Sequence, residues 1–375
     1  MSTMVGKKLG KYEIVAHLGR GGMAEVYKAV QPEIERFVAI KVMHCHLTDS
    51  EELVVRFLRE ARAIGRLHHP NIVQIIDADR TKVNARDSAE PTYYYMVMNY
   101  IEGETLGHYL QNHPPLMVEE VLHIGLQLAE VLAYAHEQGM IHRDIKPTNI
   151  LLRNGSPYDP ILTDFGLARL CDDQSAGLTV NGSMIGTPTY MSPEAIRGEP
   201  CDVQSDIYSL GTVLYELFTG RPPYVANTPY SMMMKLANEP LPPPRSLNPT
   251  LPTEVEAMLT KALAKAPTDR YADANALHVA LKEVQQVLAS PIPGSGVPTK
   301  NEAQPTSSPV LAATGNKQTT ARPLPTPTMA PPANAHPTTH TVSVPPPTER
   351  WWRLGLAILG VASIATMTVE LLLHI

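Results

Sequence analysis

Two short polar motifs constrain the fold of this 375-residue chain more than any other feature. The first is HRDIKPTN, from His142 to Asn149, and the second is DFG, from Asp164 to Gly166. The residues between the two motifs have the pattern of a short hairpin. Motifs of this kind carry meaning only in a defined structural context, so the rest of the chain has to be consistent with them.

The periodicity of apolar residues predicts a small strand-rich lobe followed by a larger helical lobe. Segments rich in Tyr, Val and Ile predict strands at Tyr12–His17, Glu25–Val30, Phe37–Val42, Val73–Ala78 and Tyr93–Tyr100. One helical pattern, from Ser50 to Leu67, interrupts these strands. After residue 102 the apolar residues recur at helical spacing, in Val118–Gln138, Ser205–Thr219, Thr253–Ala264 and Asp273–Val287.

A glycine-rich turn lies between the first two expected strands. Its residues are Leu18, Gly19, Arg20, Gly21, Gly22, Met23, Ala24, Glu25 and Val26. Glycines here let backbone N–H groups approach phosphate oxygens, although Gly-x-Gly turns also occur in ordinary hairpins. Lys41, which ends the apolar segment VAIK, could pair with phosphates or be a solvated edge lysine. Glu60 could be its carboxylate partner or a surface charge.

Charge and cysteine usage narrow the classes of partner. Lys plus Arg number 31 against 37 for Asp plus Glu, a net charge of −6, so the chain offers no basic field for nucleic acid. Cys45, Cys171 and Cys201 show no Cys-x-x-Cys spacing, which argues against a disulfide framework or a structural zinc site. The run His44-Cys45-His46 also lacks metal-site spacing and predicts a solvated loop between strand and helix.

Taken together, the motifs resemble the eukaryotic-type (Hanks-type) serine/threonine protein kinase family, from about Leu18 to Arg270. Within that family the chain is most similar to the bacterial membrane-anchored type. The resemblance implies an α+β, bilobal fold and transfer of the ATP γ-phosphoryl group to Ser or Thr hydroxyls of proteins. Lys146, two residues after Asp144, and Thr187 in the peptide-docking loop are typical of Ser/Thr rather than Tyr kinases. The alternatives are a membrane-tethered pseudokinase scaffold and a small-molecule phosphotransferase of related fold.

The resemblance also assigns catalytic roles. Asp144 would accept or orient the proton of the attacking hydroxyl, and Lys146 would neutralise the γ-phosphate during transfer. Lys41 would hold the α- and β-phosphates. Glu60 would orient Lys41 through an ion pair that forms only when its helix swings in.

The cofactors implied are ATP and Mg²⁺, with Mn²⁺ as an alternative ion. Asn149 and Asp164 would be the metal ligands, because hard cations favour oxygen. The apolar side chains of Val26, Ala39 and Leu151 would sandwich the adenine. The hinge backbone from Asn99 to Ile101, which follows Met98, would hydrogen-bond its edge. Ala24 stands where the family usually has a third glycine, which stiffens the tip of the loop.

A second group of residues matches motifs of architecture and regulation. Glu194 would pair with Arg270, and Asp206 would hold the catalytic loop by its backbone. Arg143 directly precedes Asp144, the arrangement in which a phosphorylated activation loop supplies an anion that orders the site. Arg169 would be a second cation for that anion. Autophosphorylation is expected between Asp164 and Glu194, with Thr179 the leading site ahead of Ser183 and Thr187.

The expected domain organisation is a tail over 1–10, a kinase domain over 11–288, a linker over 289–350 and a transmembrane helix over 351–375. The two lobes divide near residue 100. Of the 35 prolines, 14 fall between Pro291 and Pro347, and the stretch from Pro291 to Arg350 has no aromatic residue, which predicts a Pro/Thr-rich disordered linker.

The segment Leu354–Ile375 has one formal charge, Glu370, and as a helix would be roughly 33 Å long, enough to cross a bilayer. Tryptophans and arginines at 350–353 precede it, as at a cytoplasmic membrane interface. The N-terminus lacks a signal-peptide pattern. We therefore expect a single-pass protein of the cell membrane with a cytoplasmic kinase domain. Small residues in the helix, Ala357, Gly360 and Ser363, would let two copies pack as a homodimer.

Overall fold

The structure is a computed structural model that describes residues 4–22, 24–44, 47–48, 50–82, 92–165 and 188–289. By their contacts the residues divide into Met1–Val297 and Pro298–Ile375, and all the described residues belong to the first unit. The expected linker and transmembrane helix lie outside the described residues. Within the described part of the chain, no helix combines the length and apolar character needed to span a bilayer.

The N-terminal lobe is a six-stranded antiparallel sheet in the order β1-β2-β3-β4-β6-β5. Its strands are β1 (Lys8–Leu9), β2 (Tyr12–Arg20), β3 (Ala24–Gln31), β4 (Arg36–Met43), β5 (Ile75–Thr81) and β6 (Tyr93–Asn99). Every strand expected in this lobe is present. The lobe begins earlier than residue 11, because β1 pairs with β2 and Leu9 and Met4 are buried.

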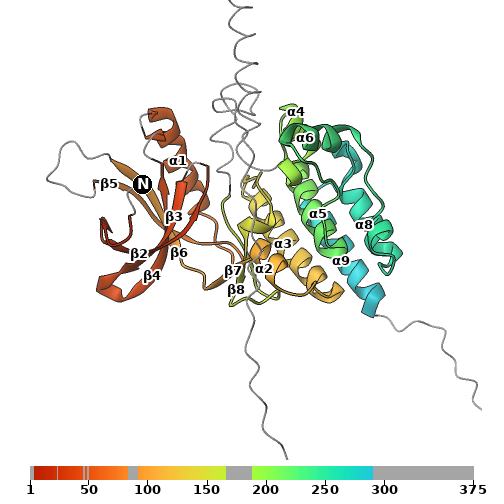
Figure 1. The fold of residues 1–375 in the computed structure, drawn as a ribbon, viewed down its shortest axis with the longest axis horizontal. Coiled ribbons are helices and arrows are strands. Elements are labelled where there is room, and N and C mark those ends of the chain that lie inside the picture. The colour runs from red at the N-terminus through yellow and green to blue at the C-terminus, as the bar shows by residue number, and fades with distance from the viewer. Residues whose placement is uncertain are drawn as a thin grey trace, which may run out of the picture. The chain divides into compact units, whose positions relative to one another are not determined.

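One helix, α1 (Glu51–Ile64), packs against this sheet (Figure 1). Ser50, where the expected helical pattern begins, caps this helix by accepting a hydrogen bond from the Leu53 backbone N–H. Its buried residues recur three or four positions apart, at Val54, Phe57, Ala61 and Ile64. This spacing gives one apolar face, and most of it joins a cluster with β4 and β6.

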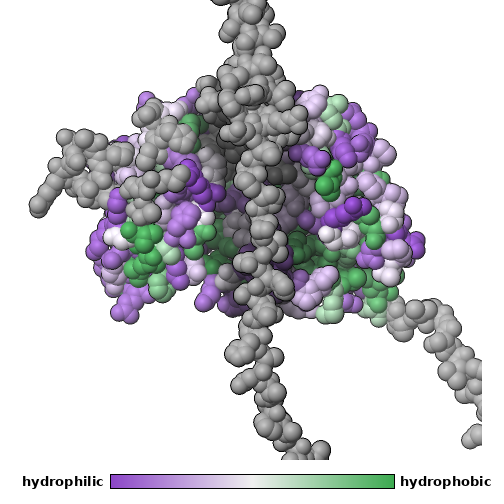
Figure 2. All heavy atoms as spheres, in the orientation of Figure 1, coloured by the Kyte–Doolittle hydropathy of each residue, from purple (hydrophilic) through white to green (hydrophobic). Residues whose placement is uncertain are grey.

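The C-terminal lobe is helical (Figure 1). Its helices are α2 (Leu106–Asn112), α3 (Val118–Glu137), α4 (Pro193–Arg197), α5 (Val203–Thr219), α6 (Pro229–Asn238), α7 (Pro244–Leu247), α8 (Thr253–Ala262) and α9 (Ala274–Ala289). Helix α3 packs on α5 and α9, and most residues of α5 are buried. Large apolar side chains fill this interior, whereas the face in Figure 2 is largely hydrophilic with smaller hydrophobic patches.

A small three-stranded sheet connects the hinge to the helical lobe. It consists of β7 (Gly103–Thr105), β8 (Ile150–Arg153) and β9 (Pro160–Leu162), paired in that order. Strands β8 and β9 are the hairpin expected between the two polar motifs. Gly103 has φ +139°, and a Cβ there would lie 2.0 Å from the Leu152 carbonyl oxygen, so only glycine lets β7 approach β8 this closely.

Candidate active site

The HRDIKPTN motif forms a loop in which two polar side chains, those of Lys146 and Asn149, contact the carboxylate of Asp144. Lys146 Nζ lies 2.9 and 2.7 Å from the two carboxylate oxygens of Asp144. Asn149 Nδ2 donates to Asp144 Oδ2 at 2.9 Å and to the Asp144 carbonyl at 2.8 Å. The side chains of Asp144 and Lys146 remain about one-third exposed, which leaves the carboxylate accessible to a substrate.

A buried carboxylate in α5 holds this loop by hydrogen bonds to its backbone. Asp206, which is fully buried, accepts hydrogen bonds from the backbone N–H of His142 at 2.8 Å and of Arg143 at 2.7 Å. The backbone of Arg143 is left-handed, with φ +66°, a conformation that costs a non-glycine residue free energy. The two hydrogen bonds to Asp206 fix this strained turn and so fix the direction of Asp144.

The imidazole of His142 joins the two motifs. Its Nδ1 accepts from the Asp144 backbone N–H at 3.2 Å, so its Nε2 carries the hydrogen that is donated to the Thr163 carbonyl at 2.8 Å. Its ring lies against Phe165, with centroids 4.5 Å apart. The position of Asp164, between Thr163 and Phe165, is thereby coupled to the catalytic loop.

The second carboxylate of the site, Asp164, forms an ion pair with the lysine of β4. Lys41 Nζ lies 2.6 Å from Asp164 Oδ1. Burial raises the pKa of Asp164, but the charge and the hydrogen bond of Lys41, with smaller contributions from other neighbouring cations, together outweigh burial and lower this pKa. Asp164 also has a left-handed backbone, φ +63°, so this side chain is held in a strained conformation at the point where the chemistry is expected.

The ion pair expected between Lys41 and Glu60 is not formed in this structure. Both residues are described, and Lys41 pairs with Asp164 instead, while Glu60 lies in α1. The structure therefore shows the arrangement in which the helix has not brought Glu60 to Lys41.

The donor set fits a hard divalent cation. Both amide hydrogens of Asn149 are used on Asp144, which leaves its carbonyl oxygen as the atom for a ligand. With the Asp164 carboxylate it offers oxygen donors, which Mg²⁺ prefers, and Mg²⁺ commonly takes only one or two protein ligands beside phosphates. Accordingly, no group of three or more His, Cys, Asp or Glu side chains among the described residues is arranged to bind a metal.

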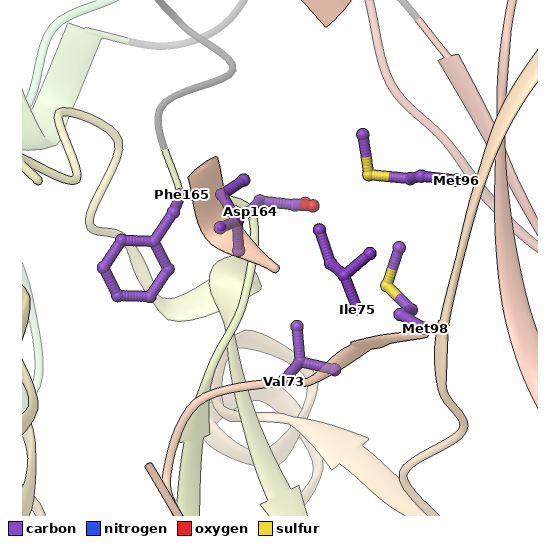
Figure 3. A pocket seen from close by; sticks show the side chains of 7 residues that line it. Val73, Ile75, Met96, Met98, Asp164 and Phe165 are labelled. Carbon is purple, nitrogen blue, oxygen red and sulfur yellow. The ribbon is translucent and has the colours of Figure 1, made fainter. Parts of the chain in front are cut away.

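The residues expected to bind adenine lie together between β3, β4, the hinge and β8. Val26, Ala39, Ile101 and Leu151 belong to one apolar cluster with Met98. Asn99 ends β6, at the start of the hinge. Met98 also lines a small pocket. The other residues that line it are Ile64, Val73, Ile75, Met96, Asp164 and Phe165. Figure 3 shows Asp164 and Phe165 pointing in different directions, with the methionines on the side of Asp164.

The glycine-rich turn joins β2 to β3, and Met23 lies outside the described residues. Neither Gly19 nor Gly21 has a positive φ, and a Cβ at either would meet nothing closer than 3.5 Å. The fold itself would accept a side chain at both positions. Close approach of a ligand to the backbone explains glycine here better than an ordinary hairpin does, which favours the phosphate-binding interpretation.

The pair Glu194–Arg270 is present as the family pattern implied. Arg270 donates to both carboxylate oxygens of Glu194 at 2.7 Å, and Ser205 donates to the same carboxylate at 2.7 Å. Burial would raise the pKa of Glu194, but these hydrogen bonds outweigh it and lower the pKa to about 2.

Sequence reasoning missed two side-chain contacts of the helical lobe, one of which involves Asp206, the residue that holds the catalytic loop. His136 donates from Nε2 to Asp206 at 2.9 Å, and Tyr190 donates to Glu216 at 2.6 Å. Both contacts join segments distant in the sequence, and neither follows from a local motif. Arg169, Thr179, Ser183 and Thr187 lie outside the described residues.

The comparisons with known proteins agree with this geometry. The protein kinase domain family matches residues 12–283. The chain is 37% identical over 277 residues to the probable serine/threonine-protein kinase PknB of Bifidobacterium longum, covering 73% of this chain and 40% of that protein. It is 40% identical over 293 residues to the serine/threonine-protein kinase Pkn1 of Myxococcus xanthus, covering 76% and 40%.

Solved structures are also similar to this chain. The kinase domain of Mycobacterium tuberculosis PknI superposes with a TM-score of 0.57 at 27% identity, covering 76% of this chain and 99% of that domain. Residues 1–466 of Rad53, in complex with AMP-PNP, superpose with a TM-score of 0.58 at 25% identity, covering 72% and 65%.

The bilobal fold, the paired motifs and these matches define a class of protein, and the chain belongs to the protein kinase family. Among its members it is similar to bacterial serine/threonine-protein kinases such as PrkC of Bacillus subtilis, with 38% identity over 280 residues. That match covers 74% of this chain and 41% of PrkC, so the chain spans less than half of the length of the curated relatives it matches.

Proposed function

We propose that this chain transfers the γ-phosphoryl group of ATP to Ser and Thr hydroxyls of proteins. The observation that carries the proposal is the Asp144 carboxylate, held by Lys146 and Asn149 beside the Lys41–Asp164 pair. Phosphoryl transfer needs positioning and cations more than covalent participation, and this site offers two lysines around two fixed carboxylates.

The residues divide the reaction between them. Asp144 takes or orients the proton of the attacking hydroxyl, and Lys146, already at 2.7 Å from that carboxylate, neutralises the γ-phosphate as charge develops. Lys41 holds the α- and β-phosphates. Asn149 and Asp164 hold Mg²⁺, which when bound supplies charge neutralisation across the phosphates.

A pseudokinase scaffold is less well supported. Such a chain would lack one of the groups that perform the chemistry, and Lys41, Asp144 and Asp164 are all in place. The complex of Rad53 with AMP-PNP, in a chain of similar fold, further supports nucleotide binding. A small-molecule phosphotransferase is not supported by relatives named as protein kinases.

The test is phosphoryl transfer by the purified full chain, with labelled ATP and Mg²⁺ and with mapping of the labelled residues. We expect phosphoserine or phosphothreonine. Asp144→Asn and Lys41→Met, which are nearly isosteric, should stay folded and lose at least two to three orders of magnitude in rate. Transfer at the wild-type rate by purified Asp144→Asn would refute the assigned mechanism.

Two finer proposals accompany this activity. The first is regulation by autophosphorylation between Asp164 and Glu194, supported by the guanidinium of Arg143. Its Nε is buried and has no hydrogen-bond partner among the described residues, as expected of a group that receives an anion. The second is attachment to the cell membrane, with a cytoplasmic kinase domain, supported by the apolar segment Leu354–Ile375. We also propose that the substrates are proteins and that two copies of the chain form a homodimer.

A further inference from the structure

His44 lies immediately after β4, at a point where the strand register brings it to the tip of the glycine-rich turn. In the β3–β4 pairing, Ala24 is opposite Met43 and Val26 is opposite Lys41. The next residue after Met43 is therefore level with the turn that precedes Ala24. Its imidazole Nε2 lies 2.9 Å from the backbone carbonyl oxygen of Gly21.

The hydrogen bond has only one direction. A carbonyl oxygen cannot donate, so His44 Nε2 carries the hydrogen and donates it. Nε2 carries a hydrogen in this neutral tautomer and in the protonated imidazolium, so the contact does not require a particular charge. His44 is thus more than a solvated loop residue between strand and helix.

The turn is also stabilised from within. The backbone N–H of Gly21 donates to the Ala24 carbonyl at 2.8 Å, and Arg20 forms an ion pair with Glu25 at 3.5 Å across the base of the turn. Neither contact uses the Gly21 carbonyl, which His44 binds. The histidine connects the Gly21 carbonyl of the turn to the end of β4, the strand that carries Lys41.

We infer that His44 is a positioning residue that holds the glycine-rich turn over the bound nucleotide and slows nucleotide release. The inference rests on the proposed function, in which the turn covers the phosphates. A turn without this tether would still form, because its internal contacts remain. It would open more often, because the hydrogen bond that joins the Gly21 carbonyl to the end of β4 would be lost.

The experiment measures dissociation of a fluorescent ATP analogue from the full chain by stopped flow. A typical hydrogen bond corresponds to an increase of about three- to tenfold, so we expect His44→Ala to release the analogue faster by that factor. The KM for ATP should rise while thermal unfolding is nearly unchanged. His44→Gln places an amide N–H at a similar reach and should restore release to within about twofold of wild type.

His123→Ala is the matched control. His123 makes the same kind of contact, from Nε2 to the Tyr158 carbonyl at 3.0 Å, but in the helical lobe. Its removal should leave release unchanged. Equal release rates in His44→Ala and wild type would overturn the inference, as would failure of a folded His44→Gln to differ from His44→Ala. Absence of analogue binding by the wild type would overturn the proposed function itself.

Discussion

At the scale of single residues, the Glu194–Arg270 pair has the most definite consequence for stability. Arg270→Met would leave a buried carboxylate without its cation and should lower the free energy of unfolding by about 3–5 kcal/mol at pH 7. Urea unfolding measures this. Arg197→Ala is the control, because its ion pair with Glu199, at 3.8 Å, is exposed and should contribute less than about 1 kcal/mol.

The same pair predicts a pH dependence. Folding lowers the pKa of Glu194 from its ordinary 4.5 to about 2, so its contribution is fully present above pH 4.5. The contribution is lost as pH falls from about 4.5 through 2. The difference between wild type and Arg270→Met should therefore shrink over this interval. A difference that stays constant down to pH 2 would contradict the role given to this carboxylate.

Residue roles in the site could be predicted from the sequence where they depend on local motifs. Asp144, Lys146 and Asn149 lie within six positions of one another, and the structure brings them together as expected. The partner of Lys41 could not be predicted in the same way. The observed partner, Asp164, is 123 positions away, so the pairing is a property of tertiary structure rather than of a local motif.

At the scale of elements, the close pairing of β7 with β8 gives a prediction about stability. Gly103→Ala should destabilise the fold by more than about 1–3 kcal/mol, because a Cβ would lie 2.0 Å from the Leu152 carbonyl and force β7 away from β8. Nucleotide affinity should fall too, because β8 carries Leu151. Gly139→Ala is the control: φ is +73°, but nothing lies within 4 Å of its Cβ, so the cost should stay near 1–2 kcal/mol. Equal losses in the two variants, by thermal or urea unfolding, would contradict this account.

The long elements could be predicted because their apolar residues repeat with a clear period. The expected Val118–Gln138 and Ser205–Thr219 correspond to α3 and α5 within one or two residues. Short elements such as β1, β7 and α2 could not, because two to seven residues hold too little periodicity. Their positions are set by pairing and packing with distant segments.

At the scale of the whole molecule, we predict that activity depends on phosphate in the loop after Asp164. Thr179→Ala should lower transfer to a protein substrate, and mass spectrometry of the active chain should find phosphate on Thr179. Arg143→Gln should make the chain insensitive to that phosphate, because its guanidinium, whose Nε is buried without a hydrogen-bond partner among the described residues, is the proposed receptor. Ser183→Ala is the control. Full activity in Thr179→Ala, with no phosphate in this loop, would refute the prediction.

We predict that the 375-residue chain attaches to a membrane. The full chain expressed in bacteria should sediment with membranes, and deletion of residues 351–375 should release it. In intact spheroplasts, protease should remove a C-terminal tag and spare an N-terminal one. The opposite pattern of protection, or recovery of the full chain in the soluble fraction, would overturn the topology. The linker would allow the kinase domain to work about 45 Å from the bilayer.

Trans-autophosphorylation should then be faster for the full chain than for the released form at equal bulk concentration, because a shared membrane raises the frequency of encounter.

The attachment of the catalytic loop to Asp206 has a consequence for how such a protein can diverge. Its partners on this carboxylate are backbone groups of the loop and one interior histidine, so the arrangement is largely independent of what the surface displays. Substitutions on the outside of the helical lobe can accumulate without altering the direction of Asp144. A lineage of duplicated genes could thus acquire new recognition surfaces one mutation at a time while inheriting the same transfer chemistry.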